Sequence, residues 1–175
     1  MPTAQVPEAV AGHAAQGKPV ALPPLTALAD GKRVRIKPLE VGIEALEITV
    51  PPKFKLTVKR PEDLPPSAHL TGQGLDIIVG PPEAGMFSLA QARRSILASD
   101  PAATFQRSEE TEAGYLLINL NNITAGGSDR RYDVAVSRPK LKVECWAIAL
   151  ERLPDAELAA SICLSLRAIP PKTGD

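Results

Sequence analysis

The chain has 175 residues, with 20 Lys and Arg against 20 Asp and Glu, so its formal net charge is zero. This length suits one domain with an appendage. The charge balance argues against nucleic acid as a partner, because nucleic-acid-binding domains carry a clustered basic face. No apolar run approaches the roughly 20 residues that a membrane-spanning helix needs. We therefore expect the partners to be other proteins, with a homo-oligomer left open.

Residues 1–40 form a segment rich in alanine and proline. Proline removes an amide donor and disfavours helix at the residue before it, so this segment is expected to be extended, as an arm or a linker. Two interpretations stay open: a flexible leader, or an arm that lies on another subunit. The second would place four prolines against that partner, namely Pro7, Pro19, Pro23 and Pro24.

The same segment has neither the basic start nor the continuous apolar stretch of a signal peptide. The chain could be a cytoplasmic protein that begins at Met1. It could also be a mature exported protein. Because of its two cysteines we favour a bacterial extracytoplasmic location, periplasmic or at the cell surface, with the cytoplasm as the alternative.

Short strands are expected after residue 40. The stretch 43–50 ends at two prolines and 53–60 follows at once, which predicts a strand, a tight turn and a second strand. In the second, lysines alternate with apolar residues, as on an outer strand with a solvated lysine face. Residues 61–74 hold three prolines and two glycines and are expected to be a loop that contains His69. A short buried strand is expected over 75–80.

Two helices are predicted. The first begins at Ser88, a good N-cap with Gln91 as its capping-box partner, and ends near Asp100. The second begins at Pro154, and its apolar residues recur at helical spacing on one side. These are Leu158, Ala159, Ile162, Cys163 and Leu166.

Between the helices the sequence predicts strands at 114–122, 132–138 and 141–150, the last two as a hairpin. In the last strand Cys145 faces the predicted core and Trp146 faces the opposite side. Strands before and after a central helix, with a second helix at the end, predict an α+β fold, an antiparallel sheet with helices packed on it. The single domain is expected over 41–170, with a tail at 171–175.

The two cysteines both face the predicted core, Cys145 from a strand and Cys163 from the terminal helix. A bond between them would close a loop of roughly 20 residues and contribute on the order of 3 kcal/mol. Two buried free thiols, or a redox or metal role, are the alternatives. There is no Cys-x-x-Cys, and the histidines, His13 and His69, lie in Pro/Gly-rich segments. We therefore predict a structural disulfide and no metal.

Four stretches carry a resemblance to a known family: LEVGIEALEITVPPKFKLT, FSLAQARRSILA, GYLLINLNN and VECWAIALERLPDAELAASICLSLR. Their order resembles small bacterial extracytoplasmic proteins of the PsbP-like superfamily, in which a Cys-bearing strand precedes a Cys-bearing terminal helix. The resemblance covers about residues 40–168 and implies an α/β/α sandwich. Because that superfamily includes photosystem accessory subunits, Ran-binding proteins and secretion chaperones, the resemblance implies binding rather than chemistry. It carries over no functional residue.

The sequence holds no catalytic or cofactor motif. A nucleophile needs a base within reach, and only His13 or His69 could act as a histidine base. We expect His69 to be a solvated loop residue, so no enzyme activity and no cofactor are predicted. An enzyme would require His69 or a carboxylate pair to meet other polar groups in a pocket.

The favoured function is that of a non-enzymatic accessory or structural subunit of a larger bacterial assembly, which docks through its N-terminal arm. Trp146 is expected either to pack under a helix or to be a further partner contact, since tryptophan is favoured at interfaces. The alternative is a carrier or chaperone that binds an apolar segment or a lipid on its sheet face, with Phe54, Leu56 and Trp146 as contacts. That alternative requires an apolar groove of roughly several hundred cubic ångströms.

Overall fold

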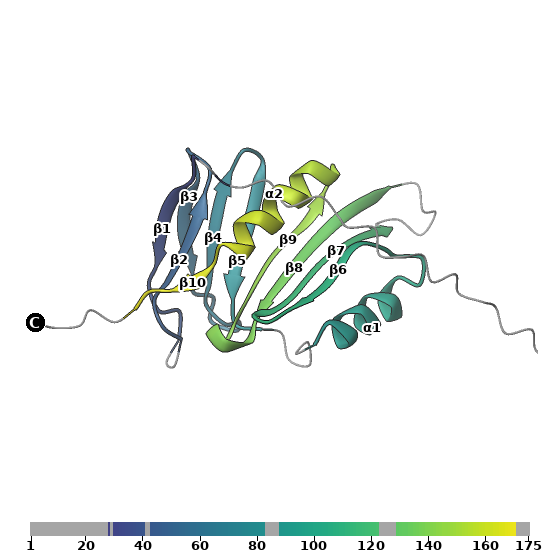
Figure 1. Ribbon diagram of the computed structural model, residues 1–175, viewed down its shortest axis with the longest axis horizontal. Coiled ribbons are helices and arrows are strands. Elements are labelled where there is room, and N and C mark those ends of the chain that lie inside the picture. Colours follow the sequence, from purple (N-terminus) through teal and green to yellow (C-terminus); the bar gives the residue numbers. More distant parts are fainter. Residues whose placement is uncertain (1–27, 29, 41–42, 83–87, 123–128, 171–175) are drawn as a thin grey trace, which may run out of the picture.

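The computed structural model describes residues 28, 30–40, 43–82, 88–122 and 129–170 (Figure 1). The prolines assigned to partner binding (Pro7, Pro19, Pro23 and Pro24) lie outside the described residues, as do His13 and the tail at 171–175.

A seven-stranded antiparallel sheet forms most of the molecule, with the strand order β3-β4-β5-β9-β8-β7-β6. Its two outer strands are β3 and β6. The lysine-bearing strand is thus at an edge, as its alternating pattern predicts, and charged side chains there discourage pairing with another chain. The strands are β3 (Lys55–Lys59), β4 (Ser67–Gly72), β5 (Leu75–Gly80), β6 (Thr104–Thr111), β7 (Gly114–Asn122), β8 (Arg130–Arg138) and β9 (Val143–Leu150).

A second, three-stranded sheet lies beside the first, in the order β1-β2-β10. It consists of β1 (Lys32–Ile36), β2 (Leu46–Val50) and the short β10 (Arg167–Ala168). Because β1 pairs with β2 along its whole length, the domain begins earlier than the predicted boundary at residue 41. The strands β2 and β3 belong to different sheets, so the two prolines between them mark a crossing from one sheet to the other rather than a hairpin.

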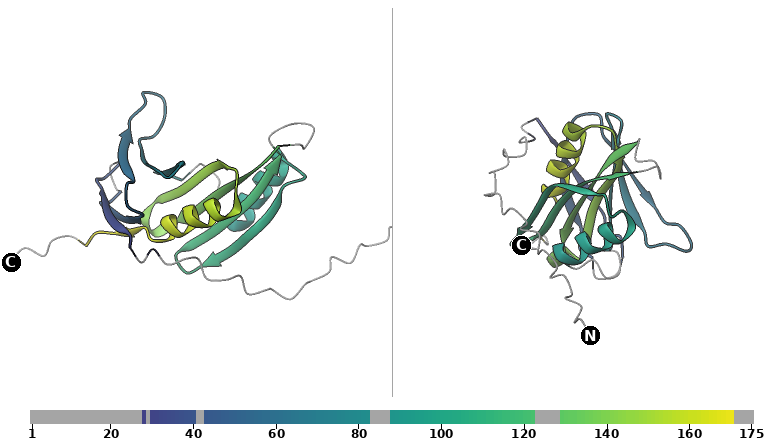
Figure 2. Two further views of the ribbon diagram at one scale, coloured as in Figure 1. Left: turned by 90° about the horizontal axis from the view of Figure 1, so that it is seen from above. Right: turned by 90° about the vertical axis from the view of Figure 1, so that its right-hand side faces the viewer.

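Each face of the large sheet carries one helix (Figure 2). Helix α1 (Leu89–Ser99) begins as predicted, because the Ser88 hydroxyl accepts a hydrogen bond from the Gln91 amide at 3.3 Å. It packs against Tyr115 and Leu117 of β7. Helix α2 (Leu153–Leu164) covers the opposite face, over β8 and β9. The α+β class, with an antiparallel sheet and packed helices, is confirmed.

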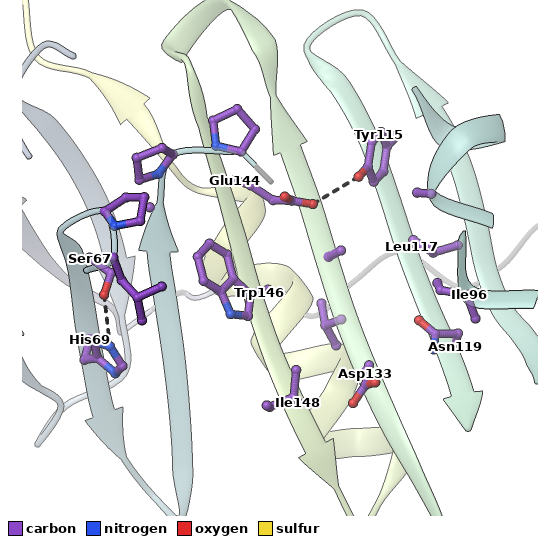
Figure 3. A pocket seen from close by; sticks show the side chains of 18 of the residues that line it. Ser67, His69, Ile96, Tyr115, Leu117, Asn119, Asp133, Glu144, Trp146 and Ile148 are labelled. Carbon is purple, nitrogen blue, oxygen red and sulfur yellow. Dashed lines mark hydrogen bonds between the residues drawn. The ribbon is translucent and has the colours of Figure 1, made fainter. Parts of the chain in front are cut away.

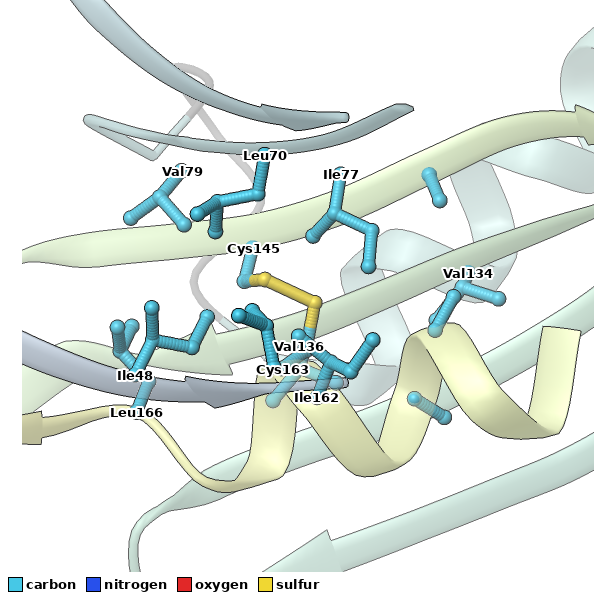
Figure 4. Close-up of a cluster of buried hydrophobic side chains, with 14 of the residues drawn as sticks. Ile48, Leu70, Ile77, Val79, Val134, Val136, Cys145, Ile162, Cys163 and Leu166 are labelled. Carbon is cyan, nitrogen blue, oxygen red and sulfur yellow. A yellow bond between two sulfur atoms is a disulfide. The ribbon is translucent and has the colours of Figure 1, made fainter. Parts of the chain in front are cut away.

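The main hydrophobic core lies between the large sheet, α2 and the small sheet (Figure 4). Alternation along each strand sends every second side chain to this face. In β7, for example, Leu116 and Ile118 face this core while Tyr115 and Leu117 face α1. The largest side chains that are fully buried come from both sheets and α2, and they include Ile36, Leu46, Ile48, Leu70, Ile77, Leu116, Ile118 and Ile162.

The predicted disulfide between Cys145 and Cys163 is confirmed. It joins β9 to α2, with 5.5 Å between the two Cα atoms, and both residues are fully buried. Structural disulfides persist mainly in oxidising compartments, so this bond is consistent with an extracytoplasmic location. None of the described helices is long and apolar enough to cross a membrane.

The segment 61–74 is not the long loop that its prolines and glycines predict. The prolines all precede the strand β4, Gly72 is its last residue, and Gly74 belongs to the tight turn that joins β4 to β5. Gln73 and Gly74 form this two-residue turn with φ angles of 52° and 79°, the left-handed geometry that favours a two-residue hairpin. His69 is therefore a strand residue, only 7% exposed, and the expectation of a solvated histidine was wrong.

Candidate functional site: an apolar groove on the open face of the sheet

A groove with a volume of about 870 Å³ lies on the face of the large sheet that carries α1 (Figure 3). One wall is α1, through Ala92 and Ile96, and the other is the segment before β4, through Leu64 and Pro65. The end of α1 is fixed by Asp100, whose carboxylate accepts the backbone N–H of Asn122 at 2.7 Å and thereby ties the helix to β7. The same bond lowers the pKa of Asp100, which keeps this tie charged.

The floor of the groove lies along a row of cross-strand neighbours on five strands, of which His69, Trp146, Ala135 and Leu117 line the groove. The register places His69 opposite Ile78, Ile78 opposite Trp146, Trp146 opposite Ala135, and Ala135 opposite Leu117. Residues paired directly in this way point to the same face of the sheet. The floor is thus apolar along most of its length and ends at His69 on one side.

Trp146 is the largest side chain of this floor, and it faces away from the disulfide as predicted. It is only partly buried, and α1 packs on β6 and β7 rather than over it. Gly80 makes room for its ring, because a Cβ at that position would come within 3.0 Å of the indole carbon Cη2. The structure therefore places this predicted binding residue at the centre of the groove, rather than under a helix.

Exposed apolar side chains gather in the groove. Among the described residues, the two most exposed large hydrophobic side chains are Leu64, at 68%, and Ile148, at 61%, and both line it. Ile148 is two residues after Trp146 on β9, so it points to the same face, and it lies near Trp146 on the floor (Figure 3). Clustered apolar exposure of this kind marks binding surfaces, whereas isolated exposed residues do not.

A buried pair of polar residues borders the floor near the start of β9. The Tyr115 hydroxyl donates a hydrogen bond of 3.0 Å to the Glu144 carboxylate, and both residues are more than nine-tenths buried. Burial, and then the Glu144 carboxylate, raise the pKa of Tyr115. The phenol therefore stays protonated and keeps donating to Glu144.

Asp133 holds a β-bulge that borders the floor near the end of β9. Two residues of β9, Ile148 and Ala149, oppose this single residue of β8. Asp133 accepts hydrogen bonds from the Ala149 backbone N–H at 2.8 Å and from the Asn121 side chain at 2.6 Å. Burial raises the pKa of Asp133 against the effect of these donors. A bulge re-aims side chains locally, and here it accompanies the exposure of Ile148.

A chain of three polar side chains lies at the β4 edge of the groove. Nδ1 of His69 lies 3.0 and 3.1 Å from the two carboxylate oxygens of Asp76, and its Nε2 lies 3.2 Å from the Ser67 hydroxyl. Ser67 and His69 line the groove, whereas Asp76, on the neighbouring strand β5, does not. His69 thus meets other polar groups in a pocket, which is the condition that an enzyme would require.

Two of the three contacts expected for a sheet-face carrier lie elsewhere. Phe54 is 3% exposed and belongs to the main core, where it packs against Gly72. Leu56 packs against the same core. Within the ranges that the structure describes, no cluster of His, Cys, Asp and Glu could hold a metal ion.

No protein-family model matches this chain, and searches of the curated proteins and of the solved structures find no match. What the protein does has to be inferred from the groove and the side chains that line it.

Proposed function

We propose that this protein is a carrier that holds an elongated apolar molecule, such as an acyl chain, in the groove over β4, β5, β9 and β8. The observation that supports this most strongly is the cluster of Leu64, Trp146 and Ile148, which leaves large apolar surfaces open to solvent inside a concavity. Covering that surface with a ligand removes apolar area from water, at roughly 25 cal/mol per Å².

The size and shape of the groove favour a small apolar ligand over a folded protein partner. Its volume of about 870 Å³ lies within the roughly 300–1,000 Å³ of small-molecule sites. The row from His69 to Leu117 crosses five strands, and four strand spacings span about 19 Å. A long, narrow floor of this kind suits an extended chain.

The polar groups of the groove support the same ligand class. Tyr115 and Glu144 are hydrogen-bonded to each other, and Asp133 is bonded to Ala149 and Asn121. A ligand therefore needs few polar groups of its own along the floor, because these protein groups already have partners.

Trp146 provides a direct assay, since it is the only tryptophan of the chain and lies on the floor. Titration with palmitic acid should shift its fluorescence emission to shorter wavelength and saturate. Ile148→Glu places a charge on the apolar floor and should weaken binding at least about tenfold.

Val58→Glu is the matched control, because Val58 is also an exposed apolar residue, at 40%, but does not line the groove. It precedes Lys59, which does line the groove, so its side chain points to the other face of the sheet. An unchanged emission spectrum, or equal loss of affinity in both variants, would contradict the proposal.

We further propose that the chain is a PsbP-like domain that acts outside the cytoplasm. The helix on each face of the antiparallel sheet and the disulfide between β9 and α2 support this interpretation. Docking on a larger assembly through residues 1–40 stays a prediction, since most of that segment lies outside the described residues.

A further inference from the structure

We propose that Ser67 is an activated nucleophile, and that an apolar acyl ester bound in the groove transfers its acyl group to the Ser67 hydroxyl oxygen. This inference rests on the proposed function, because it takes the acyl chain to lie on the apolar floor. It goes beyond ligand transport, because it assigns a reaction to Ser67, His69 and Asp76.

The hydrogen bonds fix the orientation of the histidine ring in the way that a base requires. A carboxylate can only accept hydrogen bonds, so Nδ1 of His69 must carry the proton that it shares with Asp76, 3.0 Å away. In the neutral ring, Nε2 then has a free lone pair, and it lies 3.2 Å from the Ser67 hydroxyl. A nucleophile, its base and a carboxylate that orients the base are arranged in this order in serine hydrolases, and such an arrangement is recognised by geometry rather than by sequence position.

The three residues lie on two paired strands, at a place that a ligand can reach. Ser67 and His69 are two residues apart on β4 and so point to the same face, while Asp76 comes from the neighbouring strand. His69 is more than nine-tenths buried, which shields the base from water. Ser67 is only half-buried and lines the groove.

The apolar floor begins next to the serine. A Cβ at Gly80 would lie 3.6 Å from Cβ of Ser67 and 3.0 Å from the Trp146 ring, so one glycine separates the hydroxyl-bearing residue from the centre of the floor. An acyl chain that lies over Trp146 can therefore present its carbonyl carbon to Ser67.

The reaction balances without a cofactor. The oxygen of Ser67 forms a bond to the ester carbonyl carbon, and its proton passes to Nε2 of His69. The bond to the leaving alcohol breaks, and His69 returns the proton to that alcohol. Water, activated by the same nitrogen, then hydrolyses the acyl-serine and restores both residues.

The test uses the full chain and a long-chain alkyl fluorophosphonate, which forms a bond from serine oxygen to phosphorus with loss of fluoride. Intact mass should show one adduct, and peptide mapping should locate it at Ser67. His69→Gln should slow labelling by about 10²–10⁴-fold, the usual contribution of a general base. Asp76→Asn should also slow it, since the amide lacks the carboxylate charge and can donate to Nδ1, which would move the ring proton to Nε2.

Ser137→Ala is the matched control. Ser137 is buried on β8, opposite Glu144, and does not line the groove. Its replacement should leave the labelling rate unchanged. Circular dichroism of each variant separates loss of reactivity from loss of fold.

The outcomes separate the two proposals. If palmitic acid shifts the Trp146 emission but the wild-type protein forms no adduct at Ser67, the nucleophile is refuted and the carrier stands. If neither signal appears, both proposals fail. An adduct at Ser67 that His69→Gln does not slow would also refute the activated serine.

Discussion

Replacing Cys145 and Cys163 together by alanine should destabilise the protein strongly. The disulfide spans 18 positions of sequence, and in the chain-entropy model a loop of this size contributes about 3 kcal/mol by restricting the unfolded state. Both residues are fully buried between β9 and α2, so the lost sulfur atoms also leave a void, which adds about 1 kcal/mol. The free energy of unfolding should therefore fall by about 4 kcal/mol in total.

Urea unfolding followed by circular dichroism measures this loss. Without the cross-link the unfolded chain exposes more surface, so the dependence of the unfolding free energy on urea should also become steeper. Wild-type protein unfolded in the presence of a reductant is the control, since it loses the cross-link but keeps the sulfur atoms. A loss below about 1 kcal/mol with an unchanged urea dependence would refute the reasoning. The disulfide would then not restrict the unfolded chain enough to affect stability.

Three further changes test the backbone and the small sheet. Gly114→Ala should cost about 2–4 kcal/mol in urea unfolding, because Gly114 has a φ of 141° and an added Cβ would lie 2.0 Å from a backbone oxygen of β8. Ala149→Gly should raise the unfolding free energy by about 0.5 kcal/mol, since Ala149 holds a left-handed φ of 58° in the bulge. The Arg167 side chain lowers the pKa of Glu47 below its ordinary 4.5. The stabilisation by this pair is therefore present above pH 4.5 and lost as the pH falls through the lowered pKa. The difference in urea midpoint between wild type and Arg167→Gln should shrink in acid.

The elements that sequence patterns predicted well are those whose signals are local. The capped start of α1 needs only Ser88 and Gln91, three positions apart in one turn. The β8–β9 hairpin needs only the Pro139 turn between two strands. Prediction of the disulfide combined two local patterns. Strand alternation places Cys145 on the core face, and helical spacing places Cys163 on the side of α2 that faces it. Each inference depends on residues close in sequence.

The errors arose where composition was taken for structure. The prolines and glycines of 61–74 predicted a loop, although the prolines precede a six-residue strand and the glycines lie at its end and in the turn that follows. His69 was consequently assigned to solvent. Its contact with Ser67 follows only once 67–72 is known to be a strand, and its contact with Asp76 depends on the pairing of β5 with β4. The separation of β2 from β3 is of the same kind, since sheet membership is decided by distant partners.

The groove follows from how little of one sheet face a single short helix can cover. Seven strands span about 29 Å across their hydrogen-bonding direction, whereas a helix with its side chains is about 10–12 Å wide. Helix α1 packs on β6 and β7, so it leaves most of its face open, while α2 and the small sheet together cover the other face. Alternation along β9 already shows that Trp146 and Ile148 point away from the disulfide. Only the docking position of α1 shows that neither is covered by it, and that position is decided by long-range contacts such as the one between Asp100 and Asn122. Since solvated strand faces are ordinarily polar, apolar residues retained on this open face are better explained by a ligand than by the needs of folding.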